Sequence, residues 1–145
     1  MEESASPNIT TELIRVATTV GEHYYESAAA VGLSVQEARL LFILAAKPTN
    51  MLGLRSALRV PKSTMTGLMS RMELAELIER STDVDDARQM IATPTRLGTS
   101  VAAAFTVELR TRVEGVLSAL DRTEQRELGG IFSEMLSAVE SGDRF

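Results

Sequence analysis

The side chains that carry most catalytic and metal chemistry are nearly absent from this sequence. It has one histidine, His23, and no cysteine. Zinc prefers ligands of these two types, so we expect no zinc site, and a catalytic triad would have to be built on His23 alone. The sequence also lacks a phosphate-binding glycine loop and a nucleophile–base pair. These observations predict a protein that is not an enzyme and that holds neither a metal nor a cofactor.

Positive charge is concentrated in one part of the chain. The 145 residues carry a net charge of −5, yet residues 51–72 contain four basic residues and no acidic one. These basic residues are Arg55, Arg59, Lys62 and Arg71. A local basic segment in an acidic chain is a candidate anion-binding surface.

The spacing around this segment predicts two short helices, one over residues 52–58 and one from Pro61 to about Leu74, because proline suits a first helical position. Along the second helix, four apolar residues share one face and small polar or basic residues share the other. The apolar face is Met65, Leu68, Met69 and Met72, and the opposite face is Lys62, Ser63, Thr66, Gly67, Ser70 and Arg71. This pattern is typical of a helix-turn-helix, with a solvated helix face as the alternative.

A change of period after the second helix predicts a β-hairpin. Residues 77–81 and 88–92 read as short strands joined by a polar turn over residues 82–87. A hairpin that follows a helix-turn-helix is a wing. Arg88 beside Asp86 has two interpretations: a wing arginine that reaches the minor groove with Asp86 restraining it, or a surface ion pair.

Helices are also predicted on both sides of this region. Before it, one helix is predicted over residues 9–31, and a second follows a capping box of Ser34 and Glu37 and ends at residues 47–50. After it, a long helix is predicted from Pro94 or Thr95 to about residue 120, and a last helix follows Asp121 to about residue 140. The glycine pair at 129–130 in the last helix suggests that another backbone crosses closely there.

Two apolar stripes mark the first and last helices. They consist of Ile9, Leu13, Val16 and Val20, and of Leu128, Phe132, Met135 and Val139. They could complete the core of one chain, but they are too long and too distant in sequence from the predicted wing for that role alone.

No run of 18 apolar residues predicts a transmembrane helix, and the acidic start lacks the apolar region of a secretory signal. A cytoplasmic protein without membrane contact is therefore expected. His23, Tyr24 and Tyr25 form a polar-aromatic cluster, which is either ordinary helix surface or part of a ligand pocket.

The ordered set of these patterns resembles the MarR family of bacterial transcription regulators. The resemblance runs from about residue 33 to 98. It rests on the Leu-Ser-Val-Gln-Glu-Ala-Arg-Leu-Leu opening at 33–41, on the helix-turn-helix spacing of Leu54, Leu58, Val60, Ser63, Thr64, Met65, Met69 and Met72, on Leu-Ile-Glu-Arg at 77–80, on the wing sequence at 83–88, and on the helix opening at 95–98.

The sequence departs from the family pattern at several positions. Alanine is usual where Arg55 stands, and glycine is usual where Arg59 and Glu76 stand. A residue other than glycine is costly at positive φ. Either the turn is reshaped here, or these positions do not need that conformation. In the wing only Arg88 is kept of two common arginines, and Pro94 replaces a leucine.

The resemblance implies a mostly α fold, a winged helix-turn-helix with long N- and C-terminal helices forming a dimerisation region. Its parts would be residues 1–32, a DNA-binding lobe at 33–95, and residues 96–145. It implies a homodimer that binds a pseudo-palindromic duplex DNA site, as a repressor responsive to a small aromatic or anionic ligand whose site no motif assigns. The alternative is a diverged helical dimer that acts through protein or ligand binding. The expected DNA-binding residues are Arg55, Arg59, Lys62, Ser63, Thr64, Thr66, Ser70, Arg71 and Arg88, with Asp86 supporting the wing.

Overall fold

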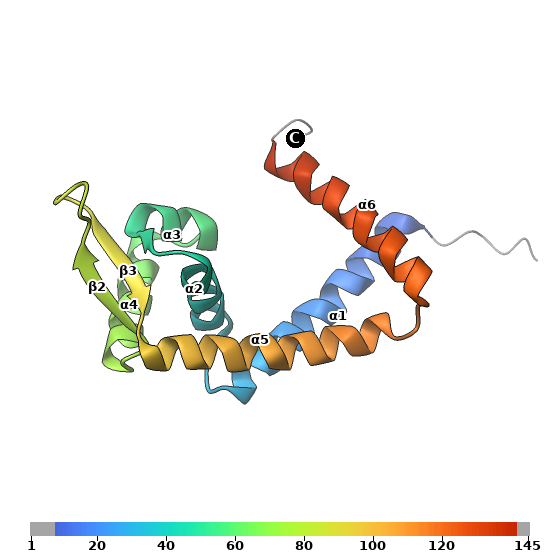
Figure 1. The fold of residues 1–145 in the computed structure, drawn as a ribbon, viewed down its shortest axis with the longest axis horizontal. Helices are drawn as coiled ribbons and strands as arrows, with labels where there is room; N and C mark the ends of the chain where they lie inside the picture. The colour runs from blue at the N-terminus through green and yellow to red at the C-terminus, as the bar shows by residue number, and fades with distance from the viewer. Residues whose placement is uncertain (1–7, 142–145) are drawn as a thin grey trace, which may run out of the picture. The chain divides into compact units, whose positions relative to one another are not determined.

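A computed structural model describes residues 8–141, and Figure 1 shows its secondary structure. The elements are α1 (Ile9–Ala30), α2 (Val35–Ala46), β1 (Thr49–Asn50), α3 (Met51–Leu58), α4 (Lys62–Leu74), β2 (Ile78–Thr82), β3 (Met90–Pro94), α5 (Arg96–Leu117) and α6 (Arg122–Glu140). The chain divides into two compact units after Arg110, so α5 begins in the first unit and ends in the second. The mostly α, winged helix-turn-helix fold predicted from the sequence is confirmed.

Polar side chains start the helices where the sequence predicts them. Ser34 Oγ accepts a hydrogen bond from the Glu37 backbone N–H, and a Glu37 carboxylate oxygen accepts one from the Ser34 N–H in return. Asp121 and Glu124 form the same capping box at α6. Each box satisfies backbone donors that have no partner inside the helix, which is why the helices begin at these residues.

The core of the first unit joins the helix-turn-helix to the hairpin. Its buried side chains come from α2, α3, α4, both hairpin strands and the start of α5, and they include the four apolar residues of α4 predicted to be buried. A second cluster forms where Phe105 of α5 packs on Ala28 and Ala38. The Tyr24 ring meets Phe105 edge-on, with ring centroids 4.9 Å apart. The second cluster fixes the end of α1 against α2 and α5.

The sheet has three antiparallel strands in the order β1-β3-β2, and Figure 1 shows the β2–β3 hairpin projecting beyond the helices. Both hairpin strands begin one to two residues later than predicted, with Ile78 opposite Pro94 and Thr82 opposite Met90. The short strand β1 was not predicted, because its two residues lie where the sequence indicates only the end of a helix. Such a strand is too short to have a readable period.

Asn50 explains why a strand forms there. Its side-chain oxygen accepts a hydrogen bond from the Gly53 N–H at 2.8 Å and so caps α3. Its side-chain nitrogen donates to Gln89 Oε1 at 2.7 Å. One residue therefore starts α3 and holds it beside the wing.

Two helix ends correct the expectation about the missing glycines. Arg59 has φ 53° and Glu76 has φ 57°, so both adopt the left-handed conformation that glycine favours. At each end, two hydrogen bonds form a Schellman motif. At the end of α3, Val60 N–H donates to Arg55 O and Arg59 N–H donates to Ser56 O. At the end of α4, Leu77 N–H donates to Met72 O and Glu76 N–H donates to Glu73 O. The turns therefore keep the shape that glycine would allow. The expectations that the turn is reshaped, or that these positions do not need positive φ, are both wrong, and Arg59 and Glu76 adopt a strained backbone conformation.

Two prolines lie just outside the helices that they were expected to open. Pro61 is the N-cap of α4, with ψ 156°, and the helix starts one residue later. Pro94 ends β3 and pairs with Ile78, so α5 begins only at Arg96. A helix interior cannot accommodate the extended ψ of Pro61 or the sheet pairing of Pro94.

The first turn of α5 packs against the joint between α4 and β2. Thr95 Oγ1 donates to Glu76 O at 2.6 Å, and Thr95 N–H donates to Leu77 O at 3.0 Å. A Cβ placed on Gly98 would lie 1.8 Å from Leu77 O. Only glycine permits this approach, which gives the Thr-x-x-Gly sequence at 95–98 a physical reason.

The glycine pair in α6 has no such neighbour. Within the described chain, no heavy atom lies within 4 Å of a Cβ built on Gly129 or Gly130. Among residues 111–141 of the second unit, the close backbone crossing predicted there is therefore not formed.

No single described helix combines the length and apolar character that a membrane crossing needs. The bent pair of α1 and α2 passes by length and composition alone.

Candidate nucleic-acid interface

Helix α4 has one buried and one exposed face. Met65, Leu68, Met69 and Met72 are each at most 2% exposed and pack into the core. The predicted DNA-binding positions Lys62, Ser63, Thr64, Thr66, Ser70 and Arg71 are all exposed. The division into faces predicted from the helical spacing is confirmed.

The exposed face is made of short side chains. The Thr66 hydroxyl donates to the Lys62 backbone oxygen at 3.0 Å, so its hydrogen is occupied while its lone pairs remain available as acceptors. The only carboxylate in the sequence of α4 is Glu73, and it is bound by Arg80 of β2. The exposed face of α4 therefore presents small polar groups without a free negative charge.

A hollow of about 260 Å³ lies between α3 and α4. Its lining residues are Met51, Leu52, Arg55, Lys62, Met65 and Thr66. The hollow brings together Arg55 and Lys62, which the sequence places on separate helices, above a mainly apolar floor. No side chain caps the N-terminus of α4 beside it. Two cations and uncapped backbone donors on one rim favour an anion over a cation.

The arginines of the lobe differ in how they are engaged. Within residues 8–141, Arg55, Arg59, Lys62 and Arg88 form no ion pair, and all four side chains are exposed. Arg71, by contrast, pairs with Glu37 of α2, Nε to Oε1, at 3.4 Å. Of the five cations among the predicted DNA-binding residues, four are therefore available to a ligand and one is held by the protein.

Asp86 shapes the turn of the wing. One carboxylate oxygen accepts from the Arg88 backbone N–H at 3.0 Å and the other from the Gln89 side-chain amide at 3.1 Å. These two hydrogen bonds lower the pKa of Asp86. The carboxylate binds the backbone of Arg88 and not its guanidinium, which is exposed. The surface ion pair considered as an alternative is not formed.

The pair of Arg80 and Glu73 was not foreseen from the sequence. Arg80 Nε lies 2.6 Å from Glu73 Oε1, and the second guanidinium nitrogen binds the other carboxylate oxygen. The hydrogen bond that Arg80 donates to Glu73 is the main cause of a raised pKa of Arg80. The pair ties the first wing strand to α4. Opposite charges seven residues apart carry no local signal when a turn separates them.

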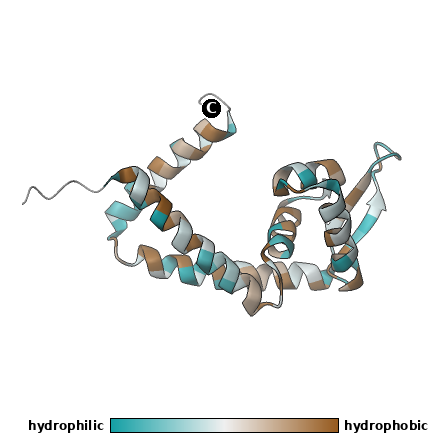
Figure 2. Cartoon of the chain, turned by 180° about the vertical axis from the view of Figure 1, so that it is seen from behind, coloured by the Kyte–Doolittle hydropathy of each residue, from teal (hydrophilic) through white to brown (hydrophobic). Residues whose placement is uncertain are grey.

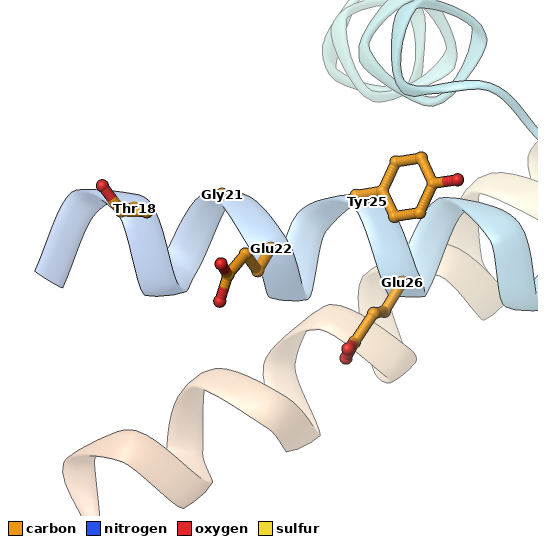
Figure 3. Close-up of a pocket in the computed structure, with 5 residues that line it drawn as sticks. All are labelled: Thr18, Gly21, Glu22, Tyr25 and Glu26. Carbon is orange, nitrogen blue, oxygen red and sulfur yellow. The ribbon is translucent and has the colours of Figure 1, made fainter. Parts of the chain in front are cut away.

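The polar-aromatic cluster of α1 does not form an enclosed site. His23 Nδ1 lies 3.5 Å from Glu26 Oε2, and Tyr24 packs on Phe105, where burial raises its pKa. A neighbouring hollow is lined by Thr18, Gly21, Glu22, Tyr25 and Glu26, all from this one helix (Figure 3). Figure 3 shows Glu22 and Glu26 projecting to the same side of α1, with the Tyr25 ring on the opposite side. Two carboxylates on its lining make this hollow unfavourable for an anion.

The described residues contain no group of three or more histidine, cysteine, aspartate or glutamate side chains arranged to hold a metal ion.

Solved structures of several regulators share this fold. RV1404 from Mycobacterium tuberculosis superimposes with a TM-score of 0.75 at 23% identity, over 93% of this chain and 97% of the other. A MepR–DNA complex from Staphylococcus aureus has a TM-score of 0.71 at 18% identity, over 92% and 99%. The MarR family protein RV2887 from Mycobacterium tuberculosis, in complex with salicylic acid, has a TM-score of 0.71 at 22% identity, over 90% and 98%.

Sequence comparison gives a result that is confined to the winged lobe. No curated protein sequence matches the chain. The family model described as "MarR family" matches residues 31–89, which run from the start of α2 through the turn of the wing. The segment contains the capping box, the helix-turn-helix and Asp86, and so covers the features on which the sequence resemblance rests except the helix opening at 95–98. The winged lobe of this chain therefore matches the MarR family model, and the chain shares the fold of these solved winged helix-turn-helix structures.

Proposed function

We propose that this chain is a transcription regulator that binds a pseudo-palindromic duplex DNA site as a homodimer, with α4 in the major groove. The observation that carries the proposal is the exposed face of α4, which has small polar side chains, no free carboxylate, and free cations beside it. Because the core face of α4 is buried, only the opposite face can meet a ligand. Short side chains allow the helix to approach base edges closely, and hydroxyls can hydrogen-bond there.

Each expected contact has a proposed role. Arg55 and Lys62, on the rim of the hollow between α3 and α4, would neutralise backbone phosphates and fix the register of the helix. Ser63, Thr66 and Ser70 would face base edges. Arg59, in the turn between α3 and α4, and Thr64, in the first turn of α4, would meet the flanking DNA backbone. Arg88 would reach the adjacent minor groove from the wing. These last assignments rest on exposure, charge and position in the fold.

A homodimer accounts for the apolar surface of α6. Ile131, Phe132, Met135, Leu136 and Val139 are between 37% and 62% exposed, and Figure 2 shows hydrophobic residues recurring along this helix. On α1, Ile9, Leu13 and Val16 are also exposed. Apolar rows of this length are typical of surfaces that a partner covers. Two lobes on one dimer would engage two half-sites about 10 base pairs apart.

Regulation by a small ligand is the second part of the proposed function. Structural relatives were solved with salicylic acid and with 4-hydroxyphenylacetate, both aromatic acids. We propose that a ligand of that class disfavours the DNA-bound form of this chain, which would make it a repressor. A cytoplasmic location follows from the proposed DNA partner.

Selection of binding sites from random duplexes tests the reading role of α4. Thr66→Ala should change preference at particular base pairs by about 1–3 kcal/mol each. Lys62→Ala should lower the affinity for all duplex sequences about equally, because contacts to phosphates carry no sequence information. Thr106→Ala is the matched control, since its hydroxyl donates to the Ala102 backbone oxygen in the same way but on α5.

If wild type selects no motif, the alternative of a diverged dimer without sequence-specific recognition is favoured. If Thr66→Ala leaves the motif unchanged, α4 is not the reading helix.

The wing is tested separately by Arg88→Ala. Loss of one phosphate or minor-groove contact should weaken binding and make the salt dependence shallower by about one counterion per subunit. An unchanged affinity and salt slope would show that the wing does not touch DNA.

A further inference from the structure

Arg71 is the one cation on the exposed face of α4 that the protein itself holds. Its Nε lies 3.4 Å from Glu37 Oε1, although its side chain is 61% exposed. One of its terminal nitrogens lies 3.6 Å from where a Cβ on Gly67 would be. The guanidinium therefore folds back over Gly67, near the middle of α4, and is held there by α2.

Glu37 serves two partners with its two oxygens. One accepts from the Ser34 N–H at 2.8 Å in the capping box of α2, and the other faces Arg71. Partial burial would raise the pKa of Glu37, but the hydrogen bonds from Ser34 and Arg71 outweigh it and the pKa is lowered. Glu37 is thus charged at neutral pH, and its position is fixed by the cap whether or not Arg71 is present.

We propose that Glu37 withholds Arg71 from DNA, so that Glu37 is a positioning residue that sets the affinity of the lobe below what its cations could give. This inference rests on the proposed DNA binding through α4. The geometry supports it in two ways. The Ser34 N–H fixes the Glu37 carboxylate, whose side chain is only 18% exposed, beside the guanidinium of Arg71. A released Arg71 would still be anchored on the face of α4 that the duplex approaches.

The decisive substitution is Glu37→Gln. Glutamine can still accept the capping hydrogen bond from Ser34, so α2 should keep its start, while the charge that holds Arg71 is removed. One additional phosphate contact corresponds to a salt slope steeper by about 0.9 per subunit, and to an affinity gain of roughly threefold or more. The measurement is a fluorescence anisotropy titration of the selected duplex at several salt concentrations.

Arg71 must be shown to carry the gain. In the wild-type background, Arg71→Ala should change affinity less than twofold, because the side chain is not engaged with DNA. In the Glu37→Gln background the same substitution should abolish the gain and restore the original salt slope. Glu79→Gln is the matched control, because it removes one exposed carboxylate from the same lobe without touching Arg71.

Three results would overturn the inference while leaving the proposed function intact. They are an unchanged affinity in Glu37→Gln, a gain that survives Arg71→Ala, and an equal gain in Glu79→Gln. A large loss in Arg71→Ala alone would mean that Arg71 already contacts DNA. A thermal melt of each variant shows whether the fold is kept, and Glu37→Asn, which also removes the charge and retains an amide oxygen, replaces Glu37→Gln if that variant unfolds. A wild-type chain that selects no duplex would overturn both the proposed function and this inference.

Discussion

Replacing Arg59 by glycine should make the protein more stable and its DNA binding weaker. Arg59 adopts φ 53° and ψ 44° at the end of α3, where its N–H and that of Val60 close the Schellman motif. Holding an L-residue in this conformation costs about 1–2 kcal/mol. Glycine removes that cost but loses about 0.5–1 kcal/mol more backbone entropy on folding. The expected net gain in the free energy of unfolding is therefore about 0.5–1 kcal/mol.

A gain of this size should raise Tm by about 2 °C, because about 1 kcal/mol corresponds to roughly 2–4 °C in a chain of this length. Melts must be compared at one protein concentration, since the stability of a dimer depends on it. Glu76→Gly, at φ 57°, should produce a similar gain. The two sites lie at the ends of different helices, so the double variant should be nearly additive.

Alanine substitutions separate the backbone from the side chain. Arg59→Ala keeps a Cβ in the left-handed conformation, so it should bring no gain in stability, yet it loses the guanidinium as Arg59→Gly does. Both variants should weaken DNA binding to the same degree, whereas Glu76→Gly should leave it unweakened. The reasoning fails if Arg59→Gly is no more stable than Arg59→Ala, because the left-handed conformation would then carry no strain.

Three further predictions concern other parts of the chain. Because the pKa of Glu37 is lower in the folded chain than its ordinary value of 4.5, its charged form stabilises the fold, and this stabilisation is complete above pH 4.5. The stabilisation is lost as the pH falls through the lower pKa of the folded chain. Glu37→Gln should therefore flatten the acid side of a profile of Tm against pH. Gly98→Ala should lower the free energy of unfolding by about 3 kcal/mol or more, because the new Cβ would overlap the Leu77 backbone oxygen. Gly129→Ala should raise it by up to about 1 kcal/mol, and a loss instead would indicate that a second chain crosses closely there. Phe132→Asp with Met135→Asp should give monomers by light scattering, since buried unpaired charge is costly, and an unchanged dimer would contradict an interface on α6.

Much of α4 could be predicted from the sequence because its two faces depend on local periodicity. The 3.6-residue repeat separates the methionine face of α4 from its polar face, whatever else the chain does. The capping boxes that begin α2 and α6 are likewise set by residues three positions apart. The basic segment at 51–72 was visible as composition alone.

Which of those cations are free was decided by tertiary structure. Arg71 meets Glu37 across 34 positions, and the side chain of Asn50 meets Gln89 across 39. Such contacts exist only because the core brings α2, α4 and the hairpin together, and no periodicity encodes them. The left-handed Arg59 and Glu76 belong to the same class. Their sequence argues against that conformation, but the packing of α3 against α4, and of α5 on the α4–β2 joint, requires the turn and outweighs the local preference.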